Sequence, residues 1–261
     1  MSGVFGMKKG LKVFGIIALL LVVAGTLAYA MGERDEKTYS WRYKTTVVVD
    51  TPEGEKSGSA VREVTVAIKS CPVHICEKGY LPGKVSTKGE AVAVDLGKRG
   101  ILFSIIPTDS YLIVFSLFSG PPGLTPEGAE YYSQLKNAKA EMGNNESIMG
   151  QIPTMVTFAD INDPKTVQLA YSVAAISVPN QAAWDFKTTD NLEKLFGAGV
   201  HLKNVTVEMT DEPITWGIEK ILVWIPSLKE RKARLNGSAS VAISDNELSN
   251  NLGTGVFKIG E

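Results

Sequence analysis

An uncharged apolar segment near the N-terminus constrains this chain more than any other feature. Residues 13–31 carry no charge, three lysines lie within residues 1–12, and acidic residues follow at once in GERDEK. As a helix this segment extends about 28 Å at about 1.5 Å per residue, close to the core thickness of a bilayer. Lysines that precede a span stay on the cytoplasmic side. We therefore expect residues 1–12 in the cytoplasm, a transmembrane or signal helix at 13–31, and export of the remainder.

Two fates of this segment stay open. Ala28 and Ala30 fit the small-x-small pattern of signal cleavage, so cutting after Ala30 releases a periplasmic protein. The full length of the segment instead suits a retained anchor. The short, lysine-rich leader resembles bacterial ones. We expect a single-pass protein of the bacterial inner membrane with its C-terminal domain in the periplasm, or a secreted periplasmic form.

The exported part has an ordinary globular composition. The chain is 44% hydrophobic and 21% charged, and about 230 of its 261 residues follow the apolar segment. This length suits one extracytoplasmic domain, which we place at residues 38–261. The formal net charge is −1. Because no basic patch appears, we expect no nucleic-acid partner, and we expect contact with the membrane and with another envelope protein.

Alternating apolar residues predict several strands. Residues 41–49 and 61–68 alternate around the turn-rich DTPEGEKSG, which predicts a β-hairpin. Residues 90–96 and 101–106 form a second predicted hairpin around GKRG. More strands are expected at the places where the pattern returns, with a bulge between Leu202 and Val205 in the one at residues 200–210. These further strands are residues 155–159, 166–173, 200–210, 239–244 and 253–259.

Three segments favour helices. Residues 125–143 begin with Thr125 as a cap and Pro126 at the first helical position. Residues 188–199 offer a capping box from Asp190 and Glu193 and a stop at Gly197. Residues 213–226 form a third, amphipathic helix between two prolines. The wholly apolar residues 111–118 favour a buried strand, with a core helix as the alternative. The predicted fold is therefore α+β, a mainly antiparallel sheet with about three helices after the N-terminal helix.

The stretch CPVHIC holds both cysteines of the chain, Cys71 and Cys76. Export to an oxidising compartment favours a disulfide between them, closing a small loop. A metal site is the alternative, with His74 and Glu77 added to the two thiolates. A redox centre is a third option, although the spacing is wider than C-x-x-C and loop-forming residues surround it.

Asp160, Asn162 and Asp163 supply three short oxygen-bearing side chains within DINDP, which is the ligand type that Ca²⁺ prefers. The alternative is that these residues make Asx turns and begin a chain reversal at Pro164. Apart from this calcium hypothesis, no cofactor is expected.

Familiar catalytic motifs are missing from the sequence. It contains no G-x-S-x-G, H-E-x-x-H or G-x-x-x-x-G-K-[ST], and only two histidines. Ser133 and Lys136 match S-x-x-K, but no K-T-G follows SNN at residues 249–251. Catalytic residues therefore stay unknown, and the balance leans against an enzyme.

Five segments resemble a group of uncharacterised bacterial membrane-anchored proteins. They are TPEGEKSGSAVREV, GEAVAVDLGKRGILF, MVTFADINDPKTV, LEKLFGAGVHLKNVTVEMTDEPIT and GIEKILVWIP. The resemblance implies a membrane segment and a compact domain, and no activity. SCPVHICEKGY and the tail after Pro226 depart from that group's pattern.

The sequence therefore predicts a membrane-tethered extracytoplasmic domain with a binding or structural role in the cell envelope. One alternative is an envelope enzyme that uses acidic residues, with Ca²⁺ at Asp160, Asn162 and Asp163. Another is a membrane protein of a phage or mobile element.

Overall fold

The computed structural model describes residues 36–71, 78, 80–81, 84–143, 152–177, 184–242 and 246–261. In these ranges no helix is long and apolar enough to cross a bilayer, and the predicted span at 13–31 lies outside them. The chain divides into two compact units, Met1–Glu36 with Lys69–Leu81, and Lys37–Ile68 with Pro82–Glu261. In the first unit, β3 (Tyr80–Leu81) pairs with Lys69 and Ser70. The second unit contains the body of both sheets.

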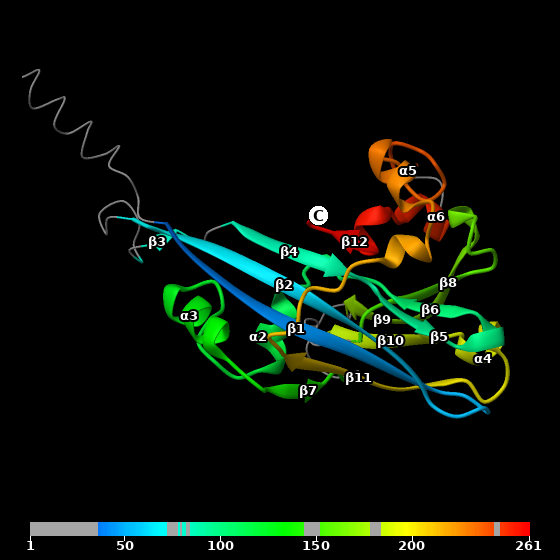
Figure 1. Ribbon diagram of the computed structural model, residues 1–261, viewed down its shortest axis with the longest axis horizontal. Coiled ribbons are helices and arrows are strands. Elements are labelled where there is room, and N and C mark those ends of the chain that lie inside the picture. The colour runs from blue at the N-terminus through cyan, green and yellow to red at the C-terminus, as the bar shows by residue number, and fades with distance from the viewer. Residues whose placement is uncertain are drawn as a thin grey trace, which may run out of the picture. The chain divides into compact units, whose positions relative to one another are not determined.

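One sheet is built on two long strands, β1 (Glu36–Asp50) and β2 (Lys56–Ser70), which run side by side in Figure 1. On the β2 side follow β4 (Val85–Glu90) and β12 (Lys258–Ile259), and on the β1 side β11 (His201–Met209) and β7 (Lys139–Glu141). In the β1–β11 register, Val48 faces Asn204 and Val49 faces Leu202. The extra residue is Lys203, so the predicted bulge is confirmed.

The other sheet has the order β10 (Trp184–Asp190), β9 (Val167–Ser177), β8 (Met155–Phe158), β6 (Ile101–Ser104) and β5 (Val92–Asp95). All of its neighbouring pairs are antiparallel. The predicted hairpin around GKRG is confirmed as β5 and β6. The α+β class with mainly antiparallel sheet is confirmed too, although the described residues carry twelve strands and five α-helices, more than the pattern predicts.

Helix α3 (Pro126–Gln134) begins as predicted and ends early. The Thr125 hydroxyl accepts a hydrogen bond from the Gly128 N–H at 3.0 Å, as a capping residue does. The predicted helix continues to residue 143, but Asn137 adopts a left-handed φ of 55° and residues 139–141 form β7. The prediction was wrong beyond Gln134: the chain leaves the helix at Leu135, whose ψ of 121° is extended, before it reaches Asn137.

The apolar segment at residues 111–118, for which a buried strand was favoured, forms the alternative, a helix, α2 (Leu112–Leu117). Its Phe115 ring lies 5.6 Å from the Trp41 ring and 4.8 Å from the Tyr132 ring, centroid to centroid. An all-apolar run has no period that separates helix from strand, so packing between α2, α3 and β1 decides the outcome.

Helix α4 (Leu192–Phe196) ends at Gly197 as predicted, with a φ of 99°. The predicted capping box is absent from it. Asp190 Oδ1 accepts from the Leu192 N–H, whereas Glu193 Oε1 accepts from the Gly199 N–H beyond the helix.

The predicted helix over residues 213–226 was also wrong. A 3₁₀ turn, η4 (Ile218–Lys220), lies there, and Pro226 is at the start of α5 (Ile225–Glu230) rather than at the end of a helix. A proline is tolerated in the first turn, where its missing N–H needs no partner. After α5 come α6 (Leu248–Asn251), η5 (Thr254–Val256) and β12. Residues 239–242 of the strand predicted at 239–244 are not in a strand.

The two sheets are joined where β4 ends and β5 begins. Arg62 of β2 is fully buried there, and its Nε donates to the Glu90 carbonyl at 2.9 Å. Its Nη1 donates to Thr45 Oγ1 at 3.3 Å, which connects β1 to the same point. Gly89 lies against Arg62 with a φ of 135°, and a Cβ there would be 2.9 Å from Arg62 Cγ. Glycine therefore fits both the conformation and the space at this joint.

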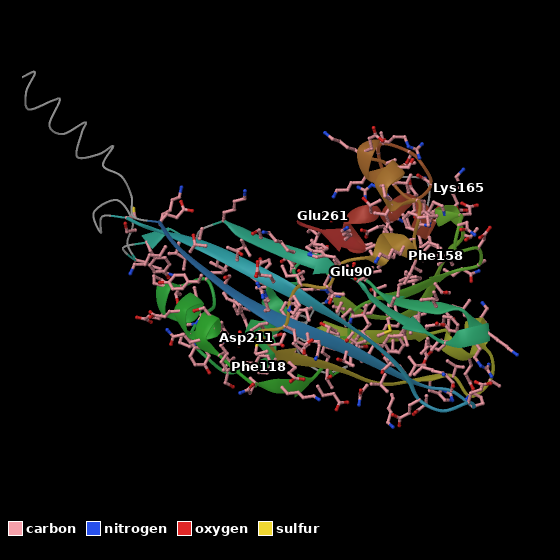
Figure 2. All side chains as sticks on the ribbon, in the orientation of Figure 1. Glu90, Phe118, Phe158, Lys165, Asp211 and Glu261 are labelled. Atoms are coloured by element: carbon pink, nitrogen blue, oxygen red, sulfur yellow. The ribbon has the colours of Figure 1, made fainter. Side chains whose placement is uncertain are left out.

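An aromatic cluster covers one face of the second sheet. Among the rings of Phe103, Phe158, Trp224 and Phe257, five pairs are in contact, with centroids from 5.5 Å apart for Phe158 and Trp224 to 6.2 Å for Phe103 and Phe257. Trp224 and Phe257 come from the C-terminal segments, so those segments complete this core. Figure 2 marks Phe158 among the side chains that fill it.

The start of β2 touches β5 through Gly58. A Cβ on Gly58 would lie 2.1 Å from the Ala93 carbonyl oxygen, whereas a Cβ on Gly255 would meet nothing within 4 Å. We expect Gly58→Ala to lower the free energy of unfolding by about 1–3 kcal/mol, as overpacking does. Gly255→Ala is the control, with an expected change within about 0.5 kcal/mol. Denaturant unfolding of both variants checks this, and equal stabilities would contradict the close approach.

Candidate functional site

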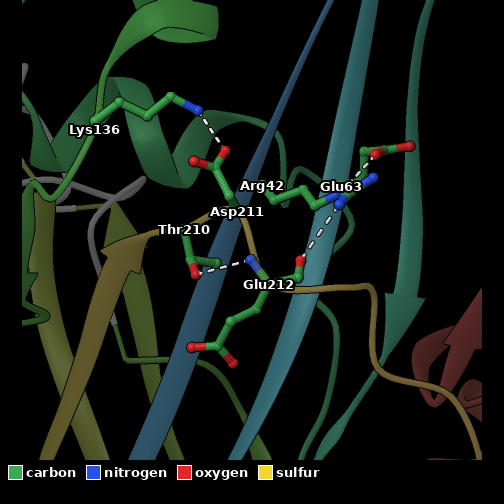
Figure 3. Close-up of polar contacts among 6 residues, drawn as sticks. All are labelled: Arg42, Glu63, Lys136, Thr210, Asp211 and Glu212. Carbon is green, nitrogen blue, oxygen red and sulfur yellow. Dashed lines mark hydrogen bonds and ion pairs between the residues drawn. The ribbon is translucent and has the colours of Figure 1, made fainter.

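A charged cleft opens where β1, β2, the end of β11 and the residues after α3 meet (Figure 3). Its volume is about 240 Å³. Its walls carry charged, hydroxyl and a few apolar side chains: Ser40, Trp41, Arg42, Glu63, Ser133, Leu135, Lys136, Met209, Thr210 and Asp211. We call this set the charged cleft.

Strand alternation explains why charges face this cleft. Trp41 and Tyr43 of β1 are buried, so Arg42 between them points outward. In β2, Glu63 faces outward beside the buried Arg62. Arg42 Nε therefore meets Glu63 Oε2 at 2.8 Å.

The chain beyond β11 closes the other side of the cleft. Arg42 Nη1 donates to the Glu212 carbonyl at 3.4 Å, and the Glu212 N–H donates to Thr210 Oγ1 at 3.2 Å. Lys136 Nζ forms an ion pair with Asp211 Oδ1 (Figure 3). A neighbouring ion pair joins Lys44 to the Glu212 carboxylate, whose hydrogen bond raises the pKa of Lys44.

The Lys136–Asp211 pair is open to solvent, whereas the Arg42–Glu63 pair is partly buried. The exposed side-chain fractions are 53% for Lys136 and 79% for Asp211, against 37% for Arg42 and 17% for Glu63. A pair as exposed as Lys136–Asp211 contributes about 0–1 kcal/mol to stability. Its charges are therefore available to a binding partner at small cost to the fold.

Trp41 adds an unsatisfied donor to the cleft wall. Its side chain is 4% exposed, and its indole N–H has no hydrogen-bond partner in the described part of the chain. Buried donors of this kind are normally paired, so a buried water oxygen would satisfy it.

Ser133 and Lys136 both line the cleft without forming the S-x-x-K arrangement. The Ser133 hydroxyl donates to the Glu130 carbonyl at 2.7 Å, and α3 ends at Gln134. Lys136 therefore lies beyond the helix and pairs with Asp211.

The predicted calcium ligands make the turn that was the alternative interpretation. Asp160 Oδ1 accepts from the Asn162 N–H at 2.9 Å, and Asp163 Oδ1 accepts from the Lys165 N–H at 3.0 Å. These residues do not line the charged cleft. Within the described ranges, no group of three or more His, Cys, Asp or Glu side chains is placed to hold a metal ion. Calcium binding at Asp160, Asn162 and Asp163 stays a prediction.

The predicted cysteine site falls largely outside the described residues. Cys71 is buried, while His74, Cys76 and Glu77 are not described. The Cys71–Cys76 disulfide and its metal and redox alternatives therefore stay predictions. The other histidine, His201, is exposed, with its Nε2 3.5 Å from Glu193 Oε1.

A second cavity, which we call the apolar pocket, has a volume of about 550 Å³. It lies between the residues that connect β6 to α2, residues 152–154 and the segment from Asn251 to Val256, with Arg234 on its wall.

Comparison with protein-family models, curated proteins and solved structures finds no match to this chain. The resemblance to uncharacterised membrane-anchored proteins therefore stays a prediction. We therefore infer function from the residues that line the charged cleft and the apolar pocket.

The sequence contains a signal for the charged cleft outside the familiar catalytic motifs. Arg42 and Glu63 occupy outward positions of the two strands in the first predicted hairpin, and they carry opposite charges. Such a pair marks a cross-strand contact. Lys136 and Asp211 come from distant segments, so no local pattern brings them to the same place.

Glu90 is the buried carboxyl group at the joint between the sheets (Figure 2). Its Oε2 accepts from the Ile218 N–H at 2.9 Å, and burial raises its pKa above the usual 4.5. A raised pKa means that the folded state binds the proton more tightly than the unfolded chain does. This contribution to stability is full below pH 4.5 and is lost as the pH rises through the folded-state pKa.

The side chain in Glu90→Gln is neutral at every pH. We therefore expect this variant to have a larger free energy of unfolding at pH 7 than the native protein. The difference should disappear as the pH falls below the unfolded pKa of Glu90, because the native side chain is then neutral as well. Denaturant unfolding across this pH range measures it. Glu230→Gln, on an exposed side chain, is the control. A difference between Glu90→Gln and the native protein that does not change with pH contradicts the raised pKa.

Proposed function

We propose that this chain is a membrane-tethered extracytoplasmic domain that binds another protein of the cell envelope through the charged cleft. The observation that carries the proposal is that two ion pairs lie on the walls of one cleft, the solvent-exposed Lys136–Asp211 and the partly buried Arg42–Glu63. Charges of this kind set the specificity and the rate of protein association more than they stabilise a fold.

The dimensions of the cleft favour a protein partner over a small molecule. Its volume of about 240 Å³ is below the roughly 300–1,000 Å³ of small-molecule sites. Its walls are mainly polar, as are the rims of protein interfaces. In the partner protein, a loop or strand end that carries one acidic and one basic side chain has charges complementary to those of the cleft.

The N-terminal segment supports the location of that partner. An apolar stretch of bilayer length, preceded by lysines, directs the C-terminal remainder of a chain across the inner membrane. A domain held there, or released there by cleavage, meets other proteins of the envelope.

Reversing the charges of the Lys136–Asp211 pair tests the proposal. The tagged full chain is expressed in its own membrane, mildly cross-linked and captured, and the bound proteins are quantified relative to the bait. Lys136→Glu places two like charges together at the cleft, so we expect the partner to be captured about tenfold less, since each 1.4 kcal/mol of like-charge repulsion is a factor of ten. Lys98→Glu, which reverses an exposed lysine outside the cleft, should leave capture unchanged.

The double variant Lys136→Asp with Asp211→Lys separates recognition from folding. It keeps an ion pair within the chain but presents the charges to a partner in reverse. We expect capture to stay low in this variant. Capture equal to that of Lys98→Glu in both variants, or full recovery in the double variant, contradicts a partner that contacts these charges.

A further inference from the structure

The apolar pocket has walls fixed by backbone hydrogen bonds. The Ile105 N–H donates to the Thr154 carbonyl at 3.0 Å, and the Ile106 N–H donates to the Val256 carbonyl at 2.8 Å. Most of the lining is aliphatic, and Ile105, Ile113 and Ile152 are each less than 10% exposed. The volume of about 550 Å³ lies within the roughly 300–1,000 Å³ range of small-molecule sites.

One cation lies on this aliphatic wall. Arg234 is half-buried, and its Nη1 donates to the Asn251 carbonyl at 3.0 Å. Its backbone is fixed by a bridge to Gly253 and by a hydrogen bond from its N–H to the Ser238 carbonyl at 2.8 Å. The side chain is therefore anchored at both ends beside the cavity.

Arg234 has no carboxylate partner among the residues that the structure describes. Arg42 and Arg99, by contrast, each bind a glutamate. The remaining N–H groups of the Arg234 guanidinium have no acceptor within the described ranges either. A guanidinium binds carboxylate and phosphate oxygens in pairs, and it does so more strongly where apolar walls exclude water.

Among the described residues of the lining, Asp109 is the one acidic side chain, and it is exposed. Water screens its charge, whereas the Arg234 guanidinium is held at the pocket by the Asn251 carbonyl. The pocket therefore favours a negative head group at Arg234 and an apolar body along the isoleucines.

We propose that the apolar pocket binds an amphiphile with a single alkyl chain and an anionic head, held by Arg234. The head group is a carboxylate or a phosphate, which share the oxygen pair that a guanidinium recognises. The alkyl chain packs against Ile105, Ile113 and Ile152. This site is separate from the charged cleft, so either proposal can fail without the other.

Photo-cross-linking locates such a ligand on the full chain. The protein is reconstituted in nanodiscs and illuminated with a decanoate analogue that carries a diazirine at the end of its chain. We expect the label on residues 105–113 and 251–256, mapped by peptide mass spectrometry. Decanoate or decyl phosphate should suppress this labelling at a concentration about tenfold or more below that of decanol, because only they place charge beside Arg234. Whichever anion competes better identifies the head group.

Variants test the role of Arg234. Arg234→Gln should lower labelling of these residues about tenfold, whereas Arg231→Gln, an exposed arginine on the same segment, should change nothing. Leu112→Trp should fill the cavity and abolish labelling. The competition experiment on the native protein needs no variant to fold. Equal competition by decanol, stronger competition by decyltrimethylammonium, labelling spread over the whole chain, or unchanged labelling of Arg234→Gln each overturns the proposal.

Discussion

The arrangement of the two sheets depends on the hydrogen bonds that the Arg62 guanidinium donates. This guanidinium is fully buried, and it binds the Glu90 carbonyl at the point where the chain leaves one sheet for the other. It also reaches Thr45 on the neighbouring strand. No carboxylate forms an ion pair with it in the described part of the chain, and its Nη2 has no hydrogen-bond partner there. A buried charge with so little compensation is expensive, so its hydrogen bonds must matter to the fold.

The cleft and the core both depend on this joint. Because Arg62 points inward, Glu63 beside it points outward and meets Arg42 in the charged cleft. The peptide group after Glu90 donates its N–H, on Ala91, to the Phe257 carbonyl at 2.8 Å, which ties the C-terminal segments to the same place. Burial raises the pKa of the nearby Tyr43 phenol, so Tyr43 stays neutral and does not neutralise the arginine. The charged cleft and the aromatic core are thus positioned by one buried side chain.

The sequence predicts those parts of the fold whose cause is local. Alternation in β1 and around GKRG, the Thr125 cap and the bulge at Lys203 are all set by neighbouring residues, and all are found. The helix at Leu112–Leu117 and the helix that begins beside Pro226 are decided by packing against distant segments, so the predictions there were wrong. Arg62 takes a core-facing position between Ala60 and Val64, so a charged residue at a position where alternation calls for an apolar one was a signal in the sequence. Asp211 and Arg234 gain their neighbours only through the tertiary fold, and no motif marks them.

Native-state hydrogen exchange of Arg62→Met tests the role of this arginine most directly. Methionine keeps the apolar length of the side chain but leaves the Glu90 carbonyl without its donor. If Arg62 holds the joint, the Ala91 amide should exchange about tenfold faster or more, since an unsatisfied buried carbonyl costs about 1–3 kcal/mol. Amides of the β9–β10 hairpin should keep their native rates. An Ala91 amide that exchanges as slowly as in the native protein, or an equal acceleration at every amide, would contradict the claim.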